Sequence, residues 1–186
     1  MDTITPVLDQ EAFRGRDDDV GLNVDTWNGG GGLNGDWTQL IDTNFRIRFE
    51  IQETAGGEHK NVIYRVQYNL AAGGWNDITG TSPIQWASTT EYINLAATTQ
   101  VIGDGSFSAG DGITGANDTG NVTLLSSSSE LEWCLSIDSA QVTDTQTFQL
   151  RIWDADTAGP LDSYTETPTI TVDEPAAAPR RIFVIS

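Results

Sequence analysis

Apolar and polar residues alternate with a period of two in several segments of this chain, a pattern typical of β-strands. The clearest is 45–52, FRIRFEIQ, in which four apolar residues share one face and four polar residues share the other: Arg46, Arg48, Glu50 and Gln52. This segment is predicted to be a half-buried antiparallel strand. The same alternation occurs in four further segments: 62–70, 130–137, 148–153 and 167–172.

Turn residues separate these segments. The run AAGG at 71–74 predicts a hairpin that leads into a strand through Ile78. Four consecutive glycines within 28–35 and the Gly- and Asp-rich stretch 103–112 predict irregular loops, because glycine is costly to order in regular structure.

One segment is open to two interpretations. Ser88 and Glu91 have the spacing of a capping box, so 88–96 is compatible with a short helix and equally with a loop. Elsewhere β-branched and aromatic residues dominate, and about ten short strands are expected. Because both apolar faces need a cover, the sequence predicts an all-β, two-sheet antiparallel β-sandwich, immunoglobulin-like or jelly-roll-like, with extended N- and C-terminal arms.

The expected organisation is an N-terminal arm over 1–10, a β-sandwich domain over 11–173, and a linker with an apolar tail over 174–186. The tail, RRIFVIS, places two basic residues before four apolar ones. Such a segment would promote aggregation if left in water, so we expect it to dock on its own domain or on the sheet edge of a neighbouring subunit, with disorder as a third possibility. The predicted partner-binding residues are Arg180, Arg181, Ile182, Phe183, Val184 and Ile185.

Composition narrows the classes of function. The 186 residues include 27 acidic and 9 basic ones, for a net charge of -18. This charge repels phosphate and anionic lipid, so neither nucleic acid nor a membrane surface is an expected partner. No apolar run approaches the ~20 residues of a membrane helix, and the first residues predict no signal peptide. A single cysteine and a single histidine leave little material for a disulfide framework or a zinc site.

Candidate sites for chemistry each have a simpler structural interpretation. The acidic run Asp17–Asp19 is expected to be a solvated loop, since adjacent carboxylates on an extended chain point apart. Asp154, Asp156 and Asp162 form a better calcium candidate, although a hairpin turn explains them too. His59 is expected to be an exposed loop residue. We therefore predict no catalytic residues, no metal and no cofactor, and no enzymatic activity.

Tryptophan and cysteine raise two further possibilities. Four tryptophans near predicted loops could form a stacking platform for sugars, although tryptophans near hairpins more often cover a core: Trp27, Trp37, Trp75 and Trp86. Cys134 lies on the outward side of its strand by alternation, which suggests that a second face of the sheet is covered.

Five stretches, in chain order, resemble β-sandwich virion structural proteins of tailed bacteriophages, a family that includes head decoration and cement proteins: 42–56, 66–79, 97–112, 130–152 and 161–172. The resemblance implies a non-enzymatic capsid decoration protein that binds the outer surface of the major capsid protein and stabilises the head. It also implies synthesis in the host cytoplasm, location on the capsid surface, and a homo-oligomer such as a trimer. The alternative is a carbohydrate-binding or host-adhesion module of a phage head or tail fibre; a hydrolase is the least favoured hypothesis.

Overall fold

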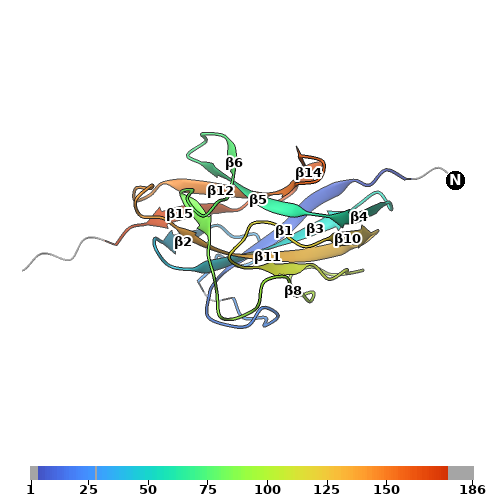
Figure 1. Cartoon of the computed structure of the whole chain (residues 1–186), viewed down its shortest axis with the longest axis horizontal. Helices are drawn as coiled ribbons and strands as arrows, with labels where there is room; N and C mark the ends of the chain where they lie inside the picture. Colours follow the sequence, from blue (N-terminus) through green and yellow to red (C-terminus); the bar gives the residue numbers. More distant parts are fainter. Residues whose placement is uncertain (1–3, 28, 176–186) are drawn as a thin grey trace, which may run out of the picture.

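The alternating segments form two sheets that pack face to face (Figure 1). The structure is a computed structural model that describes residues 4–27 and 29–175. In these residues it contains strands and no helix, and it confirms the prediction of a two-sheet β-sandwich. Most strand pairs are antiparallel, as expected. Three pairs are parallel: β1 (Leu8–Asp17) with β14 (Ser163–Tyr164), β11 (Ser128–Ile137) with β9 (Asp111–Ile113), and β15 (Thr169–Asp173) with β2 (Trp37–Leu40).

The first sheet, sheet A, is built around the long strands β3 and β11. Its strands, in spatial order, are β14 (Ser163–Tyr164), β1 (Leu8–Asp17), β3 (Phe45–Glu53), β11 (Ser128–Ile137), β9 (Asp111–Ile113) and β8 (Ala96–Ala97), with β7 (Ile84–Trp86) also paired to β11.

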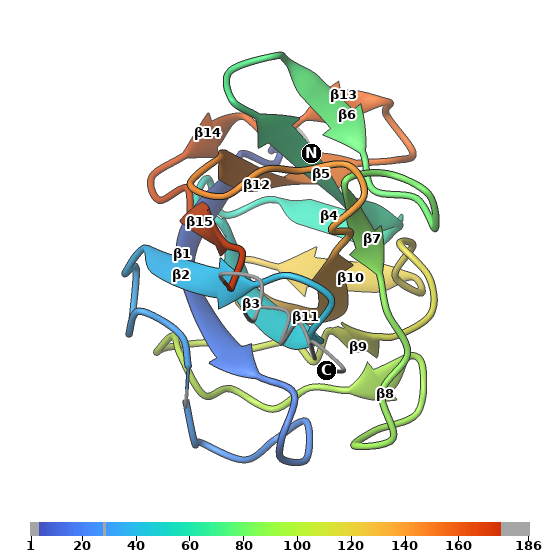
Figure 2. The same cartoon turned by 90° about the vertical axis from the view of Figure 1, so that its left-hand side faces the viewer.

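The second sheet, sheet B, lies across the core from sheet A (Figure 2). Its strands, in spatial order, are β2 (Trp37–Leu40), β15 (Thr169–Asp173), β12 (Thr147–Asp154), β5 (Tyr64–Leu70) and β6 (Trp75–Asp77), with β13 (Gly159–Pro160) paired to β12. A separate ribbon joins β4 (Glu58–Val62) to β10 (Val122–Leu125).

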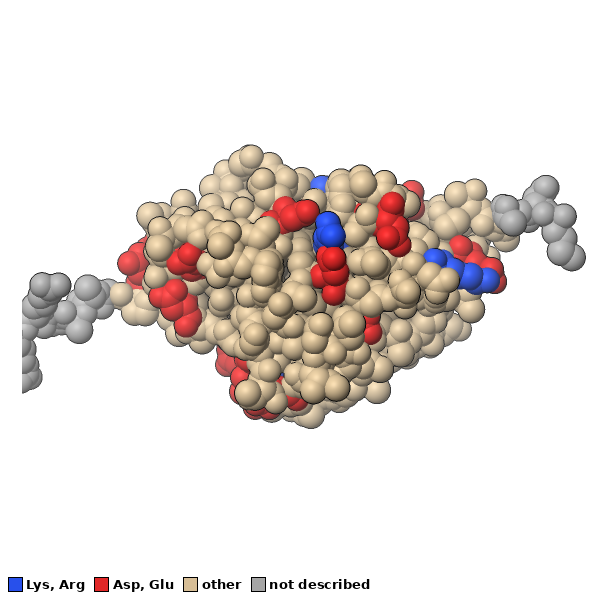
Figure 3. Space-filling model, viewed as in Figure 1, with Lys and Arg blue, Asp and Glu red and all other residues tan. Residues whose placement is uncertain are grey.

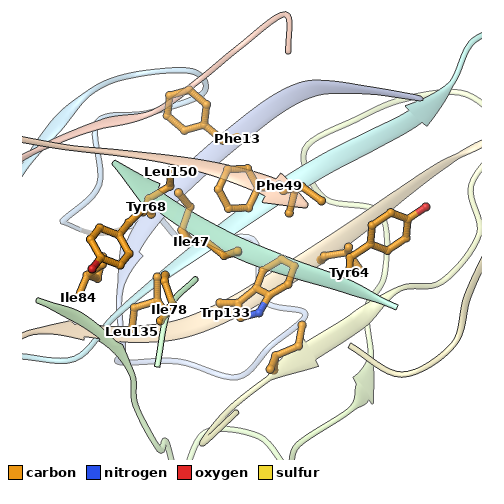
Figure 4. Packing of buried hydrophobic residues seen from close by; sticks show 14 of the residues in the cluster. Phe13, Ile47, Phe49, Tyr64, Tyr68, Ile78, Ile84, Trp133, Leu135 and Leu150 are labelled. Carbon is orange, nitrogen blue, oxygen red and sulfur yellow. The ribbon is translucent and has the colours of Figure 1, made fainter. Parts of the chain in front are cut away.

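The core forms where the apolar faces of the two sheets meet (Figure 4). Phe49 and Trp133 from sheet A stand edge to face, with ring centroids 6.1 Å apart. The indole N–H of Trp133 is buried but satisfied, because it donates a 2.9 Å hydrogen bond to the carbonyl of Asn117. Each large apolar side chain buried in this way contributes about 1.5–3 kcal/mol of transfer free energy.

Strand β1 was not predicted from the sequence. A β-bulge between Gln10 and Ala12 shifts its register against β3, so the period-two pattern breaks within the strand. Both Leu8 and Phe13 are nevertheless buried in the core. Residues 8–10, which the sequence analysis placed in the N-terminal arm, therefore belong to this strand.

The segment 88–96 is not a helix; it runs in bends and turns until β8 begins at Ala96. Individual side chains of this segment hydrogen-bond to groups on the outer side of sheet A. The hydroxyl of Thr89 donates to Asp18 at 2.8 Å, and the Tyr92 hydroxyl donates to the carbonyl of Ile113 at 3.1 Å. These tertiary contacts replace the regular backbone bonds that a helix would need.

Loops cover the outer side of sheet A, the side that faces away from sheet B (Figure 1). Arg46, Arg48 and Glu50 alternate with the core residues of β3 as predicted, yet they are buried. The expectation of a half-buried strand is therefore wrong for β3. The cover also confirms the suggestion drawn from Cys134, which is fully buried on this outer face.

Candidate functional site

A cluster of ion pairs lies between sheet A and its covering loops. Glu132 of β11 is at its centre and contacts three arginines: Arg16 Nη2 at 2.7 Å, Arg46 Nη1 at 3.0 Å and Arg48 Nε at 2.6 Å. Arg48 also reaches Glu130, with 3.0 Å between Nη1 and Oε2. The side chains of these five residues are fully buried.

Asp18 completes the cluster, with Arg46 Nε lying 3.2 Å from its Oδ1. Asp18 is thus a nearly buried partner of an arginine, and the expectation that Asp17–Asp19 forms a solvated loop is wrong for this residue. The cluster holds three arginines and three carboxylates, so its formal charge is zero. This balance matters because an unpaired charge is very costly to bury.

Loop carbonyls accept hydrogen bonds from several of the other guanidinium N–H groups. Arg16 donates to the carbonyl of Leu22 at 2.9 Å and to that of Val24 at 2.8 Å. Arg48 donates to the carbonyl of Thr99 at 2.9 Å. The arginines therefore hold two covering loops, through residues 22–24 and Thr99, on the sheet.

The carboxylate of Glu130 binds the second loop through backbone N–H groups. Its Oε1 accepts hydrogen bonds from Val101 at 2.9 Å, Ile102 at 2.8 Å and Gly103 at 3.1 Å. Such an arrangement resembles an anion-binding backbone nest, but the anion is supplied by the sheet itself. The backbone of residues 101–103 is consequently used to hold this loop on the sheet.

Aromatic rings close the cluster on its outer side. The guanidinium of Arg16 lies 4.9 Å from the ring centroid of Trp27, and that of Arg46 lies 5.5 Å from the ring centroid of Tyr92. Burial lowers the pKa of Arg16 and raises the pKa of Tyr92, because both charged forms lose their hydration. The covered face is therefore closed off by aromatic rings as well as by loop backbone.

The calcium candidate Asp154, Asp156 and Asp162 serves the backbone. The carboxylate of Asp154 accepts a 2.9 Å hydrogen bond from the backbone N–H of Asp156 in the same turn. Asp156 accepts from Ile63 at 3.1 Å, and Asp162 accepts from Leu8 at 2.8 Å. Within residues 4–27 and 29–175, no three His, Cys, Asp or Glu side chains are arranged to hold a metal ion.

His59 is not an exposed loop residue. It lies in β4 with its side chain 17% exposed, and its Nε2 is 3.4 Å from Asp154 Oδ2. Its ring meets that of Tyr64 edge to face at 6.2 Å. Burial raises the pKa of Tyr64, so this phenol stays neutral beside the aspartates.

The four tryptophans do not form one platform. Trp37 is buried in the core, and Trp27 covers the ion-pair cluster. Trp75 packs on the guanidinium of Arg151 at 4.3 Å, on the outer face of sheet B. Of the four, Trp86 lines a sizeable concavity formed by described residues.

That concavity is a groove of about 420 Å³ where the edges of the two sheets come together. It lies between the end of the β5–β6 hairpin, β7 and the loop 115–118 (Figure 2). Its lining residues are Arg65, Asp77, Ile78, Thr79, Trp86, Gly115, Ala116, Asn117 and Asp118. Trp86 was named as a candidate from the sequence, but the groove was not predicted, because its lining comes from four separate stretches of the chain.

One wall of the groove is a row of three charged side chains. Arg65 makes a two-pronged ion pair with Asp118, in which Nε meets Oδ1 and Nη2 lies 3.1 Å from Oδ2. On the other side, Arg65 Nη1 is 3.8 Å from Asp77 Oδ2. The ion pairs raise the pKa of Arg65, so the guanidinium stays charged. All three side chains are between about one third and one half exposed.

The predicted partner-binding residues of the tail, from Arg180 to Ile185, lie outside the described residues. Among the residues that are described, no helix is both long and apolar enough to cross a lipid bilayer. No family model matches the sequence, and no curated protein matches it either.

Proposed function

We propose that this chain is a non-enzymatic virion structural protein, a decoration protein that binds the outer surface of the major capsid protein of a tailed bacteriophage and stabilises the head. The family resemblance is the reason for naming a phage head. The structural part of the proposal is supported by the way in which this sandwich uses its long loops.

The observation that carries the proposal is the buried ion-pair cluster. Binding and catalytic residues are found disproportionately on loops. Here the loop segments 22–24 and 99–103 cover sheet A, and their backbone groups hydrogen-bond to Arg16, Arg48 and Glu130. A body stiffened in this way suits a protein that resists mechanical load.

The surface charge supports the same proposal. Acidic side chains outnumber basic ones on the face shown in Figure 3. Three of the nine basic residues are fully buried in the cluster, which leaves the acidic ones to dominate the surface. This surface keeps a protein made at high copy number soluble and away from the packaged genome.

Attachment is assigned to the two ends of the chain. Strand β1 begins at one end of the long axis of the sandwich and β15 finishes at the other (Figure 1). Segments leaving from opposite ends can engage two neighbours at once, and such bivalent contacts raise avidity in a symmetric shell. The tail from Arg180 to Ile185 is proposed to supply a strand or an apolar anchor to a neighbouring subunit.

The experiment is reconstitution on phage heads that lack this chain. The full-length protein should saturate the outer shell at a fixed stoichiometry, visible as added density by electron microscopy, and should raise the temperature at which DNA is released. Deletion of 176–186 should lower occupancy at least about tenfold. The matched control replaces these residues with a Gly/Ser segment of equal length. No binding to heads, or density on the tail alone, would overturn the proposal.

A further inference from the structure

We infer that the groove lined by Trp86 and Arg65 is a binding site for a neutral carbohydrate. This inference goes beyond attachment to a capsid and does not depend on it. The groove is about 420 Å³, which lies within the ~300–1,000 Å³ range of small-molecule sites. It also combines an apolar ring with a few polar groups that face it, as such sites do.

The first requirement for sugar binding is an aromatic surface for the C–H face of a pyranose ring. Trp86 packs partly against the core, and its remaining surface lines the groove. Its neighbours are small: a Cβ added at Gly80 would lie 2.8 Å from the indole Cζ2, and Gly115 and Ala116 form the adjacent lining. Trp86 is thus flanked by residues without long side chains, and it remains partly exposed.

The second requirement is a set of planar groups that both donate and accept. The wall presents them in the order Asp118, Arg65, Asp77, which is acceptor, donor, acceptor. A sugar hydroxyl donates one hydrogen and accepts others, so two vicinal hydroxyls match neighbouring groups of this row. Because the ion pairs already hold Arg65 in place, little side-chain entropy is lost when a ligand binds.

The charges select a neutral ligand. Two carboxylates against one guanidinium leave the groove with a formal charge of -1, and the protein as a whole carries -18, so anionic sugars are repelled. An amine or a basic peptide would meet the guanidinium of Arg65, which stands between the carboxylates. A neutral polyol avoids both penalties.

The side chain of Asn117, which lines the groove, already has hydrogen-bond partners within the protein, so it does not extend into the space for a ligand. The amide of Asn117 accepts from the N–H of Val66 at 3.0 Å and donates to the carbonyls of Val66 and Ile78 at 3.1 and 3.0 Å. Asn117 therefore shapes the groove. Arg65 and Asp118 are paired with each other and Asp77 also accepts from Gln67 Nε2 at 2.9 Å, but the exposed parts of these three groups have room for hydrogen bonds to the sugar.

The test begins with the full-length protein on an array of neutral, sialylated and sulfated glycans and aminosugars. Neutral hits are then titrated in solution by calorimetry. Saturable binding of a neutral glycan is expected, and Trp86→Ala and Asp118→Ala should each weaken it at least about tenfold, because each removes one of the two recognition elements.

The matched control is Trp75→Ala, which removes a tryptophan that is also partly buried but does not line the groove. Its affinity should equal that of the wild type. Asp118→Asn, which preserves the shape of an exposed side chain, checks that a loss of binding does not come from unfolding; it should weaken binding less than Asp118→Ala. Absence of any neutral hit, a preference for charged glycans, or affinity unchanged in Trp86→Ala would overturn the inference. Attachment to phage heads would be unaffected by any of these results.

Discussion

The outer faces of the two sheets have the same alternating sequence pattern but lie in different environments. Arg48 on β3 and Arg151 on β12 both alternate with core residues of their strands. Arg48 is fully buried among carboxylates and loop carbonyls. Arg151 lies half-buried on the open face of sheet B, where it contacts Trp75 at 4.3 Å and Trp153 at 5.2 Å.

The difference shows that the presence or absence of covering loops determines whether a polar strand face is buried or exposed to water. The loops that connect the strands of sheet A are long enough to lie across its outer face. The buried charges between this face and the loops are paired, so that their sum is zero. Sheet B has short connections, so its polar face stays near water, where Arg151 is satisfied by Gln67 Oε1 at 2.8 Å and by aromatic rings. The same residue type therefore has a different energetic role on each face.

The largest effect is expected at the centre of the covered face. Glu132→Ala removes the carboxylate shared by Arg16, Arg46 and Arg48, and leaves buried arginines without full compensation. The free energy of unfolding should fall by about 3–5 kcal/mol, measured by urea denaturation. A loss below about 1 kcal/mol would mean that the cluster is hydrated and that the two faces are alike.

A smaller effect is expected from two carboxylates of β3 that differ in pKa. Backbone N–H groups of Val7 and Ala55 donate to Glu53 and, against the effect of burial, lower its pKa. Burial raises the pKa of Glu50, and neighbouring carboxylates add to the shift. The stability due to Glu53 is therefore present above its unfolded pKa of 4.5 and lost as the pH falls. The ionisation of Glu50 instead destabilises the fold as the pH rises through its folded pKa.

Glu53→Gln should accordingly cost on the order of 1 kcal/mol at pH 7 and less at pH ~4. Glu50→Gln should raise the free energy of unfolding at pH 7. This gain should vanish at low pH, since Glu50 is then protonated in both the folded and the unfolded protein. Thermal melts of both variants across this range provide the measurement. If the stability of both variants changed with pH in the same direction, the conclusion that Glu50 and Glu53 lie in opposite environments would be wrong.

The smallest effect is expected on the open face. Arg151→Ala removes the stacking on Trp75 and Trp153, which contributes about 0.5–1 kcal/mol at a partly exposed site. Arg151→Lys, the control, should keep part of this amount because it retains the charge. A cost comparable to that of Glu132→Ala, measured in the same urea experiment, would remove the contrast between the two faces.

Prediction of the site was less complete than prediction of the fold. Trp86 was recognised as a candidate for stacking, but Arg65 lies within the alternating segment 62–70 and no functional role was predicted for it. Asp77 and Asp118 carry no local signal, since they become a pair only when the β5–β6 hairpin meets the loop 115–118. The tail residues remain a prediction, because they lie outside the described residues.

Local alternation was sufficient to identify β3, β5, β11, β12 and β15 and to assign the facing of their side chains, including the outward position of Cys134. It works because successive side chains of a strand must point to opposite faces, whatever surrounds them. Whether an outward face meets water depends on chain that is distant in sequence. Glu132 and Arg16 are 116 residues apart, and only folding brings them within 2.7 Å and makes a polar face into a buried layer.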